Sequence, residues 1–248
     1  MAVKRETREI FRYAAPFATW ILLQTALPAT AWAYAARTVV TALVGIGCLW
    51  QRGLRPTGTT GILPVGGGSR SCATAAGHLG EAVPSPLRLF IGLLVGVLVT
   101  VLWIAPEFST FYRTWFCWPI GSLPTASPAP SPYEPAVCGW TLTITKLIGS
   151  AFVIAPVEEV FFRSFLYRWL QKRDFLSVPL SRFNLSAFLW MVFLFTLEHD
   201  RPLAAAVAGA AYGLAAVRFG LSSAVVAHVT TNLLLALHVI FSGAWAFW

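Results

Sequence analysis

Charged side chains are scarce in this chain of 248 residues. They make up 11% of it, whereas apolar residues make up 57%, and an ordinary soluble domain carries about 25% charged residues. So few charges exclude a surface that is solvated by water all round. The natural solvent for such a chain is the lipid bilayer, and we expect an all-α fold, a polytopic transmembrane helix bundle of about seven to eight helices.

Cysteine is rare too, and several motifs are missing. The four cysteines include no CxxC pair and no zinc spacing, which argues against a cysteine-ligated metal. Cys117 and Cys138 fall in an expected outer loop, where a disulfide and two free thiols fit the sequence about equally well. No GxSxG elbow is present, and no Ser or Cys has a recognisable nucleophile context. Water is therefore the expected nucleophile of any hydrolysis.

Long runs without charge predict where the helices lie. Residues 1–139 should form amino-terminal membrane helices, interrupted by a flexible Gly- and Pro-rich cytoplasmic loop at 53–86 and ending in an outer loop at 107–139. Residues 140–248 should form a second helical unit. The expected helices are at about 10–27, 29–50, 87–105, 140–171, 183–199, 202–217 and 221–246.

The net charge of +8 indicates membrane topology and not a nucleic-acid partner, because the basic residues lie beside apolar spans and form no patch with interleaved aromatics. With a cytoplasmic amino terminus, only Arg113 and Arg201 fall on outer segments. Arg37 lies inside the second span, where we expect a structural partner on a neighbouring helix. Thirteen basic residues then fall on inner segments: Lys4, Arg5, Arg8, Arg12, Arg52, Arg55, Arg70, Arg88, Arg168, Lys172, Arg173, Arg182 and Arg218.

Two adjacent carboxylates interrupt the fourth expected span. Glu158 and Glu159 stand among residues that belong in hydrocarbon, and each costs at least about 2.5 kcal/mol to insert. Glu159 and Arg163, four apart with the acid first, have the favourable spacing of a helical ion pair. Glu158 points about 100° away around the helix and has no partner of its own. We interpret Glu158 as a general base or acid, with a structural salt-bridge cluster as the alternative.

Three more polar residues stand on two later spans. His199 ends the fifth expected helix, a position that alone would indicate an interfacial residue. His228 and Asn232 are four apart on one face of the last helix, so an imidazole and an amide could donate to the same oxygen. That pairing suits an oxyanion hole, although polar contacts between helices explain it equally well. His238 lies off this face and is expected to be structural.

Together these residues would supply a base, a second acid/base and an oxyanion stabiliser from three helices. The leading hypothesis is an intramembrane endopeptidase that acts on a membrane-associated protein or peptide. A transporter with a proton relay is one alternative, but it needs a continuous polar path and the first three helices offer only Arg37 and Gln24. A non-catalytic membrane partner is the other. The sequence leaves the oligomeric state and the substrate open.

The order of these motifs resembles a known family. The EExxxR stretch at 158–163, the FxxxH stretch at 195–199 and the HxxxN stretch at 228–232 resemble the CPBP family, which comprises CAAX prenyl proteases and bacteriocin-processing membrane enzymes. The resemblance covers about residues 140–240. The segments 35–38 and 102–107 look like the CAAX-protease-related branch associated with bacterial exosortase systems, which implies a multi-pass protein of the bacterial inner membrane.

The resemblance implies a role for each motif residue. Glu158 and His199 would activate the water, His228 and Asn232 would stabilise the oxyanion, and Glu159 would be held in place by Arg163. Residues 140–248 would then be the catalytic core. The family has been described both as metal-free and as zinc-dependent. We expect no cofactor, because Asn232 suits an oxyanion donor better than a metal ligand. If zinc is bound, Glu158, His199 and His228 are the expected ligands.

Overall fold

The computed structural model describes residues 2–53, 85–111 and 130–248. The 53–86 loop, apart from its ends, and most of the 107–139 loop, with Cys117, lie outside these residues. The described part contains helices and no strand, so the all-α prediction is confirmed. Seven main helices are present: α1 (Ala2–Ala26), α2 (Ala31–Gly53), α3 (Pro86–Ile104), a long helix of five consecutive segments, α8 (Leu185–Thr196), α9 (Pro202–Phe219) and α10 (Leu221–Ser242).

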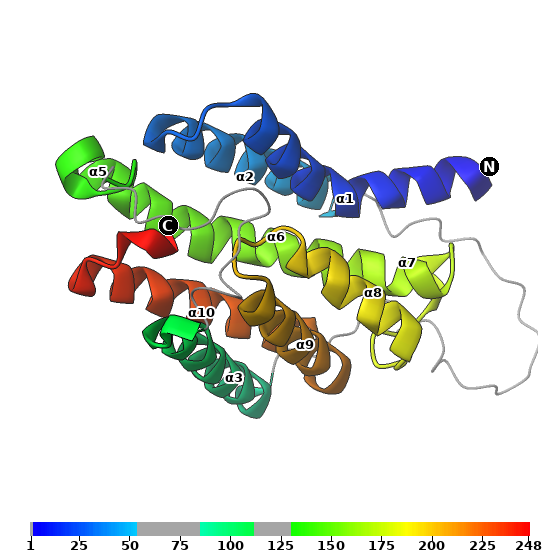
Figure 1. The fold of residues 1–248 in the computed structure, drawn as a ribbon. Helices are drawn as coiled ribbons and strands as arrows, with labels where there is room; N and C mark the ends of the chain where they lie inside the picture. Colours follow the sequence, from blue (N-terminus) through cyan, green and yellow to red (C-terminus); the bar gives the residue numbers. More distant parts are fainter. Residues whose placement is uncertain (1, 54–84, 112–129) are drawn as a thin grey trace, which may run out of the picture.

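The long helix is the centre of the molecule, and we call residues 135–171 the central rod. It consists of α5 (Pro135–Ile148), the π-helical turn η2 (Gly149–Ile154), α6 (Ala155–Glu159), a second π-helical turn η3 (Val160–Leu166) and α7 (Tyr167–Gln171). In Figure 1 the rod crosses the molecule, with α1 and α2 on one side and α10, α9 and α3 on the other. Short 3-10 turns follow at η1 (Ala105–Phe108), η4 (Phe175–Ser177) and η5 (Trp245–Phe247).

Several helix ends differ from the sequence prediction, and three of the differences have a local reason. Helix α1 begins at Ala2 and not near residue 10. The apolar run did not reveal its first turns because they are polar, and Glu9 of these turns pairs with Arg12 at 2.9 Å. Helix α8 ends at Thr196 and not at 199, which leaves His199 in the turn before α9. Helix α10 ends at Ser242 because Gly243 adopts a left-handed conformation with φ of 70°.

Five helices of the described part are long and apolar enough to cross a membrane: α2, α3, the rod, α9 and α10. Helix α8 is apolar but has 12 residues, which gives about 18 Å of helix against about 30 Å of hydrocarbon. The fifth expected span is therefore too short to cross the bilayer by itself. The protein is an integral, multi-pass membrane protein.

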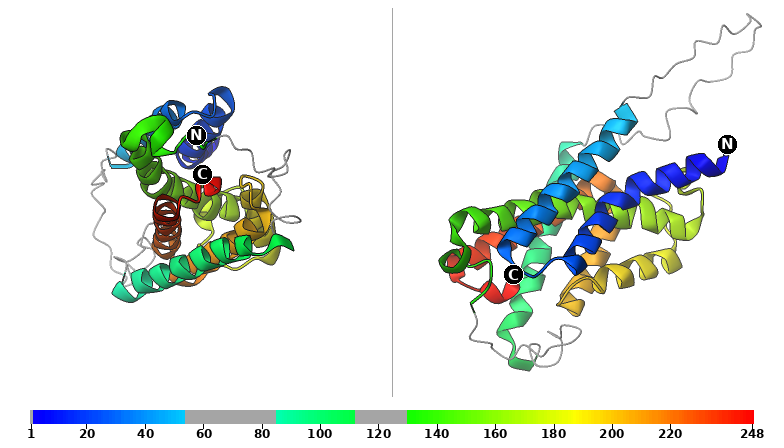
Figure 2. Two further views of the ribbon diagram at one scale, coloured as in Figure 1. Left: turned by 60° about the vertical axis from the view of Figure 1, so that its left-hand side comes forward. Right: turned by 90° about the horizontal axis from the view of Figure 1, so that it is seen from above.

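Helix α3 packs closely on α10, as the left view of Figure 2 shows. A Cβ atom added at Gly96 would lie 2.5 Å from Ala227 O, and one added at Gly92 would lie 2.7 Å from Ser223 O. The hydroxyl of Thr231 donates to Gly96 O at 3.0 Å. Small residues four apart allow this approach, which is a common way for membrane helices to pack. Ala227 directly precedes His228, so this contact fixes the part of α10 that bears the imidazole.

Candidate active site

The glutamate pair lies at the one short α-helical segment between two π-helical turns. Pro156 in α6 has no N–H, so it cannot complete the backbone ladder there. The backbone instead forms wider turns, in which Ala155 N donates to Ser150 O and Tyr167 N to Phe162 O, each five residues back. Such turns are frequent at functional sites. Here they flank Glu158 and Glu159, which are 8% and 0% exposed.

Glu159 forms the ion pair that its spacing to Arg163 predicts. Arg163 Nη1 lies 3.0 Å from Glu159 Oε1, and both side chains are buried. Arg163 Nη2 also donates to Gly209 O of α9 at 3.2 Å, and the guanidinium lies 4.4 Å from the ring centroid of Phe195. A buried ion pair is most favourable when further contacts satisfy its remaining atoms, and here Arg163 Nε and Glu159 Oε2 have no hydrogen-bond partner among the described residues. This one links the rod to α9.

His228 of α10 lies between the two carboxylates. Its Nδ1 is 2.9 Å from Glu159 Oε1 and its Nε2 is 3.8 Å from Glu158 Oε2. Since Glu159 is ionised by its pairing with Arg163, Nδ1 carries the hydrogen and donates it. The ring of Tyr212 stacks on the imidazole at 4.7 Å and 21°. The orientation of His228 is thus fixed, with Nε2 directed toward Glu158.

Glu158 is the carboxylate of this group that no arginine pairs with, although Glu159 Oε2 is likewise without a hydrogen-bond partner among the described residues. Its Oε2 has no hydrogen-bond partner among the residues that the structure describes, and the atom is buried. The contact to His228 Nε2 at 3.8 Å is an ionic contact and too long for a hydrogen bond. An unsatisfied buried carboxylate oxygen in a hydrocarbon-rich core calls for an explanation. It matches the sequence expectation that Glu158 lacks a structural partner.

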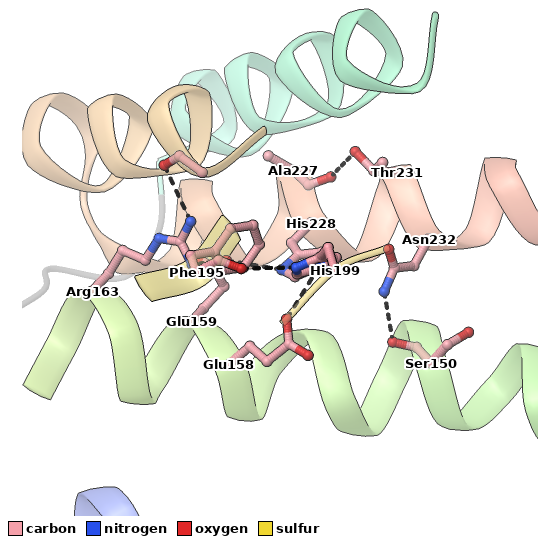
Figure 3. Close-up of polar contacts among 11 residues, drawn as sticks. Ser150, Glu158, Glu159, Arg163, Phe195, His199, Ala227, His228, Thr231 and Asn232 are labelled. Atoms are coloured by element: carbon pink, nitrogen blue, oxygen red, sulfur yellow. Dashed lines mark hydrogen bonds and ion pairs between the residues drawn. The ribbon is translucent and has the colours of Figure 1, made fainter. Parts of the chain in front are cut away.

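His199 lies near this group without a direct hydrogen bond to it. Its Nδ1 donates to Phe195 O at 2.9 Å, because a carbonyl can only accept, and this leaves Nε2 for another partner. The Phe195 ring lies 4.6 Å from the His199 ring and 5.9 Å from the His228 ring. His199 also interacts electrostatically with Glu158 and His228. The two histidines, which the sequence placed on two different helices, therefore border the same phenylalanine (Figure 3).

Asn232 lies one turn beyond His228 and contacts the rod. Its Nδ2 donates to Ser150 O at 3.0 Å, and an amide nitrogen has a second hydrogen to donate. Ser150 O also accepts from Ala155 N, so Asn232 binds the backbone of the π-helical turn. Figure 3 shows this bond beside the glutamate and histidine group. Ser150 is a site residue that the sequence analysis did not identify, since its contact uses only backbone atoms.

Two more residues near the site were missed. Tyr212 of α9 stacks on His228, but a tyrosine in an apolar helix gives no signal beyond general packing. Glu198 interacts electrostatically with Glu158 and Arg163, and its position directly before His199 could have drawn attention to it. Across the described ranges, no three His, Cys, Asp or Glu side chains are grouped as ligands for one metal ion.

The comparisons with known proteins agree with this location. Residues 140–234 match the model of a family described as type II CAAX prenyl endopeptidase Rce1-like. No curated protein and no solved structure matches the chain significantly. The matched segment runs from the rod into α10 and includes Glu158, His199 and His228. Over these residues the chain is similar to the Rce1-like, type II CAAX prenyl endopeptidases of the CPBP family.

Proposed function

We propose that the protein is an intramembrane endopeptidase that hydrolyses a peptide bond of a membrane-associated protein with a water molecule activated at Glu158. The observation that carries the proposal is the arrangement of Glu158 and His228. A carboxylate oxygen without a hydrogen-bond partner faces an imidazole nitrogen at 3.8 Å in the core of a membrane bundle. The match to a protease family supports the same conclusion.

In the proposed mechanism Glu158 is the general base. The water would bind to Glu158 Oε2 and to one further polar atom, each at a normal hydrogen-bond length of about 2.8 Å. Glu158 takes a proton from the water as its oxygen forms a bond to the scissile carbonyl carbon. The protonated Glu158 then gives this proton to the leaving nitrogen as the C–N bond breaks. The free Nε2 of His199 is the second group proposed to orient the water.

His228 and Asn232 are proposed to stabilise the oxyanion. Glu159 fixes His228 through Nδ1, so His228 can donate from Nε2 only when both nitrogens carry hydrogen. Charge balance favours that form, because Arg163 and a charged His228 together offset Glu158 and Glu159 in a medium that disfavours net charge. Asn232 retains one N–H beyond its bond to Ser150 O. Preorganised donors of this kind are a large part of enzyme catalysis.

Chemistry without a bound metal is part of the proposal, and zinc at Glu158, His199 and His228 is the alternative. Incubation of the purified protein with a chelator separates the two. Activity that persists after chelation supports direct activation by Glu158. Activity that is lost and returns with Zn²⁺ supports the zinc form, since metal-bound water would then be the nucleophile.

For the location and orientation of the protein, we propose the bacterial inner membrane and the cytoplasmic amino terminus that the sequence predicts.

The central experiment is Glu158→Gln, assayed by co-expression with candidate membrane-anchored substrates. We expect cleavage to fall about 10²–10⁴-fold, the range for loss of general acid–base catalysis, while insertion and elution in detergent remain normal. Glu134→Gln, at the start of the same rod and outside the site, is the matched control and should retain activity. Undiminished cleavage by the Glu158→Gln protein would refute the assignment.

A further inference from the structure

The residues that follow α10 fold back across the end of the bundle at which the rod begins, and we call residues 243–248 the strap. Gly243 has φ of 70°, a conformation that L side chains rarely adopt, and it turns the chain directly after Ser242. The 3-10 turn η5 follows. In the left view of Figure 2, which faces this end, the red end of the chain lies over the middle of the bundle.

Arg201, in the turn between α8 and α9, holds the strap from one side. Its Nη2 donates to Ala246 O at 2.8 Å, and its guanidinium lies 4.5 Å from the ring centroid of Phe247. Arg201 is 7% exposed, and shielding from water strengthens both contacts. Its ion pair with Asp200 contributes little, because the Asp200 side chain is 62% exposed. A shielded cation thus joins this turn to the strap.

The strap also contacts α10 and the rod. The Phe247 ring packs edge-on against His238 of α10, with 5.8 Å between the ring centroids. Trp248 packs against a group of buried side chains that includes Ile154, in the first π-helical turn of the rod. The strap therefore extends from the α8–α9 turn, over the end of α10, to the rod.

These are the elements that carry the proposed catalytic residues. His199 and Arg201 belong to one turn, two residues apart. On the rod, Ile154 precedes Glu158 by four residues, and on α10 the histidine that contacts the strap lies six residues beyond Asn232, which corresponds to about 6 Å and about 9 Å of helix. Both contacts lie toward the end at which the rod begins. The strap therefore closes this side of the candidate active site.

The attachment of the strap allows it to move as a unit. Each residue of η5 is at least partly exposed, and Gly243 provides a backbone that can change direction at little cost. Segments with few buried contacts open at a much lower free energy than the whole fold. Aromatic side chains such as Trp245 and Phe247 are also stable at a membrane surface. The strap can thus open while the helix bundle stays folded.

We propose that the strap is a lid over the candidate active site, that Arg201 holds it closed, and that a membrane-associated substrate enters when the strap moves away. This inference rests on the proposed function. With the strap closed, Glu158 is only 8% exposed. A substrate that binds only the open form has its apparent affinity reduced by the fraction of molecules that are open. Weakening the contacts of Arg201 raises that fraction.

Movement of the strap is measured as the distance between two spin labels, with the protein in phosphatidylcholine nanodiscs. The labels are attached at Ala246→Cys in the strap and at Ala29→Cys between α1 and α2, two exposed positions, after the four native cysteines are replaced by alanine. We expect a single distance in the resting protein. Arg201→Met should raise the open fraction about tenfold and add a second distance, as loss of a shielded hydrogen bond to a charged group would give.

Two further variants and a matched control test the contacts of the strap. Phe247→Leu removes the ring below the guanidinium and should also add the second distance, whereas Arg201→Lys keeps the charge and should open the strap less than Arg201→Met. Arg168→Met is the control, because Arg168 also faces a phenylalanine ring, that of Phe175 at 5.3 Å, but at the other end of the rod. It should leave the single distance unchanged. A single distance in the Arg201→Met protein overturns the proposal.

Substrate entry is tested with a pool of fluorescent, lipid-anchored peptides of randomised sequence. The pool is added to the Glu158→Gln protein, so that no cleavage occurs. It should produce the same second distance, and it should bind about tenfold more tightly once Arg201→Met is added, in proportion to the open fraction. A strap that stays closed while the pool binds overturns the proposal.

Cleavage assays without the Glu158→Gln change separate the lid from the proposed function. For peptides that are cleaved, Arg201→Met should lower KM about tenfold and leave kcat close to that of the native protein, since only the open fraction changes. A fall in kcat at unchanged KM would overturn the lid and assign Arg201 to positioning His199. If no peptide is cleaved while Arg201→Met opens the strap and tightens binding, the protease assignment fails and the lid stands. If peptides are cleaved and no second distance appears, the lid fails and the protease assignment stands.

Discussion

Two of the buried arginines, Arg163 of the rod and Arg37 of α2, have opposite environments. Arg163 has a carboxylate, a backbone carbonyl and an aromatic ring as partners, all supplied by this chain. The Arg37 guanidinium lies over the rings of Trp20 and Tyr34, and no carboxylate pairs with it in the part of the chain that the structure describes. The first arginine belongs to a group whose charges balance internally. The second belongs to a group in which aromatic rings face the cations.

Structural and functional charges in a membrane bundle differ in what their removal leaves behind. A charge that completes its own pair costs stability when it is removed, because its partner is left behind. A charge without such a partner can be removed with little loss of stability, and its loss should show in binding. Burial alone does not distinguish the two, since both side chains are at least nine-tenths buried.

Arg163→Met should have the largest effect on stability. It leaves Glu159 ionised and buried without its partner, and breaking a buried pair in this way costs about 3–5 kcal/mol. Chemical or thermal unfolding in detergent measures the loss. The double variant Glu159→Gln with Arg163→Met should recover part of it, since no charge is then left unpaired. If the double variant is as unstable as Arg163→Met alone, the pair is not the source of the effect.

Gly96→Leu should have an intermediate effect, through packing and not through charge. The new side chain would meet Ala227 O and push α10 away from α3, and overpacking of this kind costs about 1–3 kcal/mol. Because His228 follows Ala227, cleavage should fall by more than stability alone explains. Gly47→Leu is the control, since nothing lies within 4 Å of a Cβ at that position. Normal cleavage by a folded Gly96→Leu protein would contradict this account.

Tyr212→Leu should have a smaller effect, because it removes the ring stacked on His228, with its edge contact to Phe195 and its contact to the Arg163 guanidinium, and leaves every charged group in place. Aromatic pairs contribute about 0.5–1.5 kcal/mol beyond buried area, which corresponds to up to about a tenfold change in rate if the imidazole is misaligned. Measured kcat should fall while KM changes little. Tyr212→Phe keeps the stacked ring and should retain most of the activity. Equal loss in both variants would assign the effect to the hydroxyl.

Arg37→Met should have the smallest effect on stability, although Arg37 is also buried. It leaves no carboxylate unpaired and removes two cation–π contacts, each of about 0.5–1 kcal/mol, together with an uncompensated charge. We expect the unfolding midpoint to stay close to that of the native protein, or to rise. A loss as large as that of Arg163→Met would show that Arg37 has a structural counter-charge and would remove the contrast between the two sites.

The sequence predicted the parts of the fold and site that depend on local spacing. The seven helices follow from apolar runs, and the pairing of Glu159 with Arg163 follows from a separation of four residues in a helix. His228 and Asn232 do lie on one side of α10, both directed at the rod. The roles of Glu158, His199 and the oxyanion pair remain predictions for the experiments above.

The rest depends on how helices pack, which spacing does not encode. The contact of Asn232 with Ser150 requires α10 to meet a π-helical turn, and nothing in the pattern of apolar residues indicates that turn. The end of α8 at Thr196 was also missed, because the apolar pattern continues to Leu197 while the turn before Pro202 ends the helix. Arg37 was expected to meet a neighbouring helix, and its ring contacts appear only once α1, α2 and α5 are placed together.

The length of the rod has a consequence for the lipids around it. A kink at Gly139, with φ of 79°, sets off its first turn, and the helix from residue 140 to residue 171 is about 48 Å long, well above the thickness of the hydrocarbon layer. Such a helix must lie at a steep slant or project into the headgroups, and α8 beside it is too short to reach both leaflets. A short helix favours a locally thinner bilayer, and a long helix beside it can accommodate such thinning by tilting. Thinning there shortens the path by which water from the aqueous phase reaches the buried carboxylates.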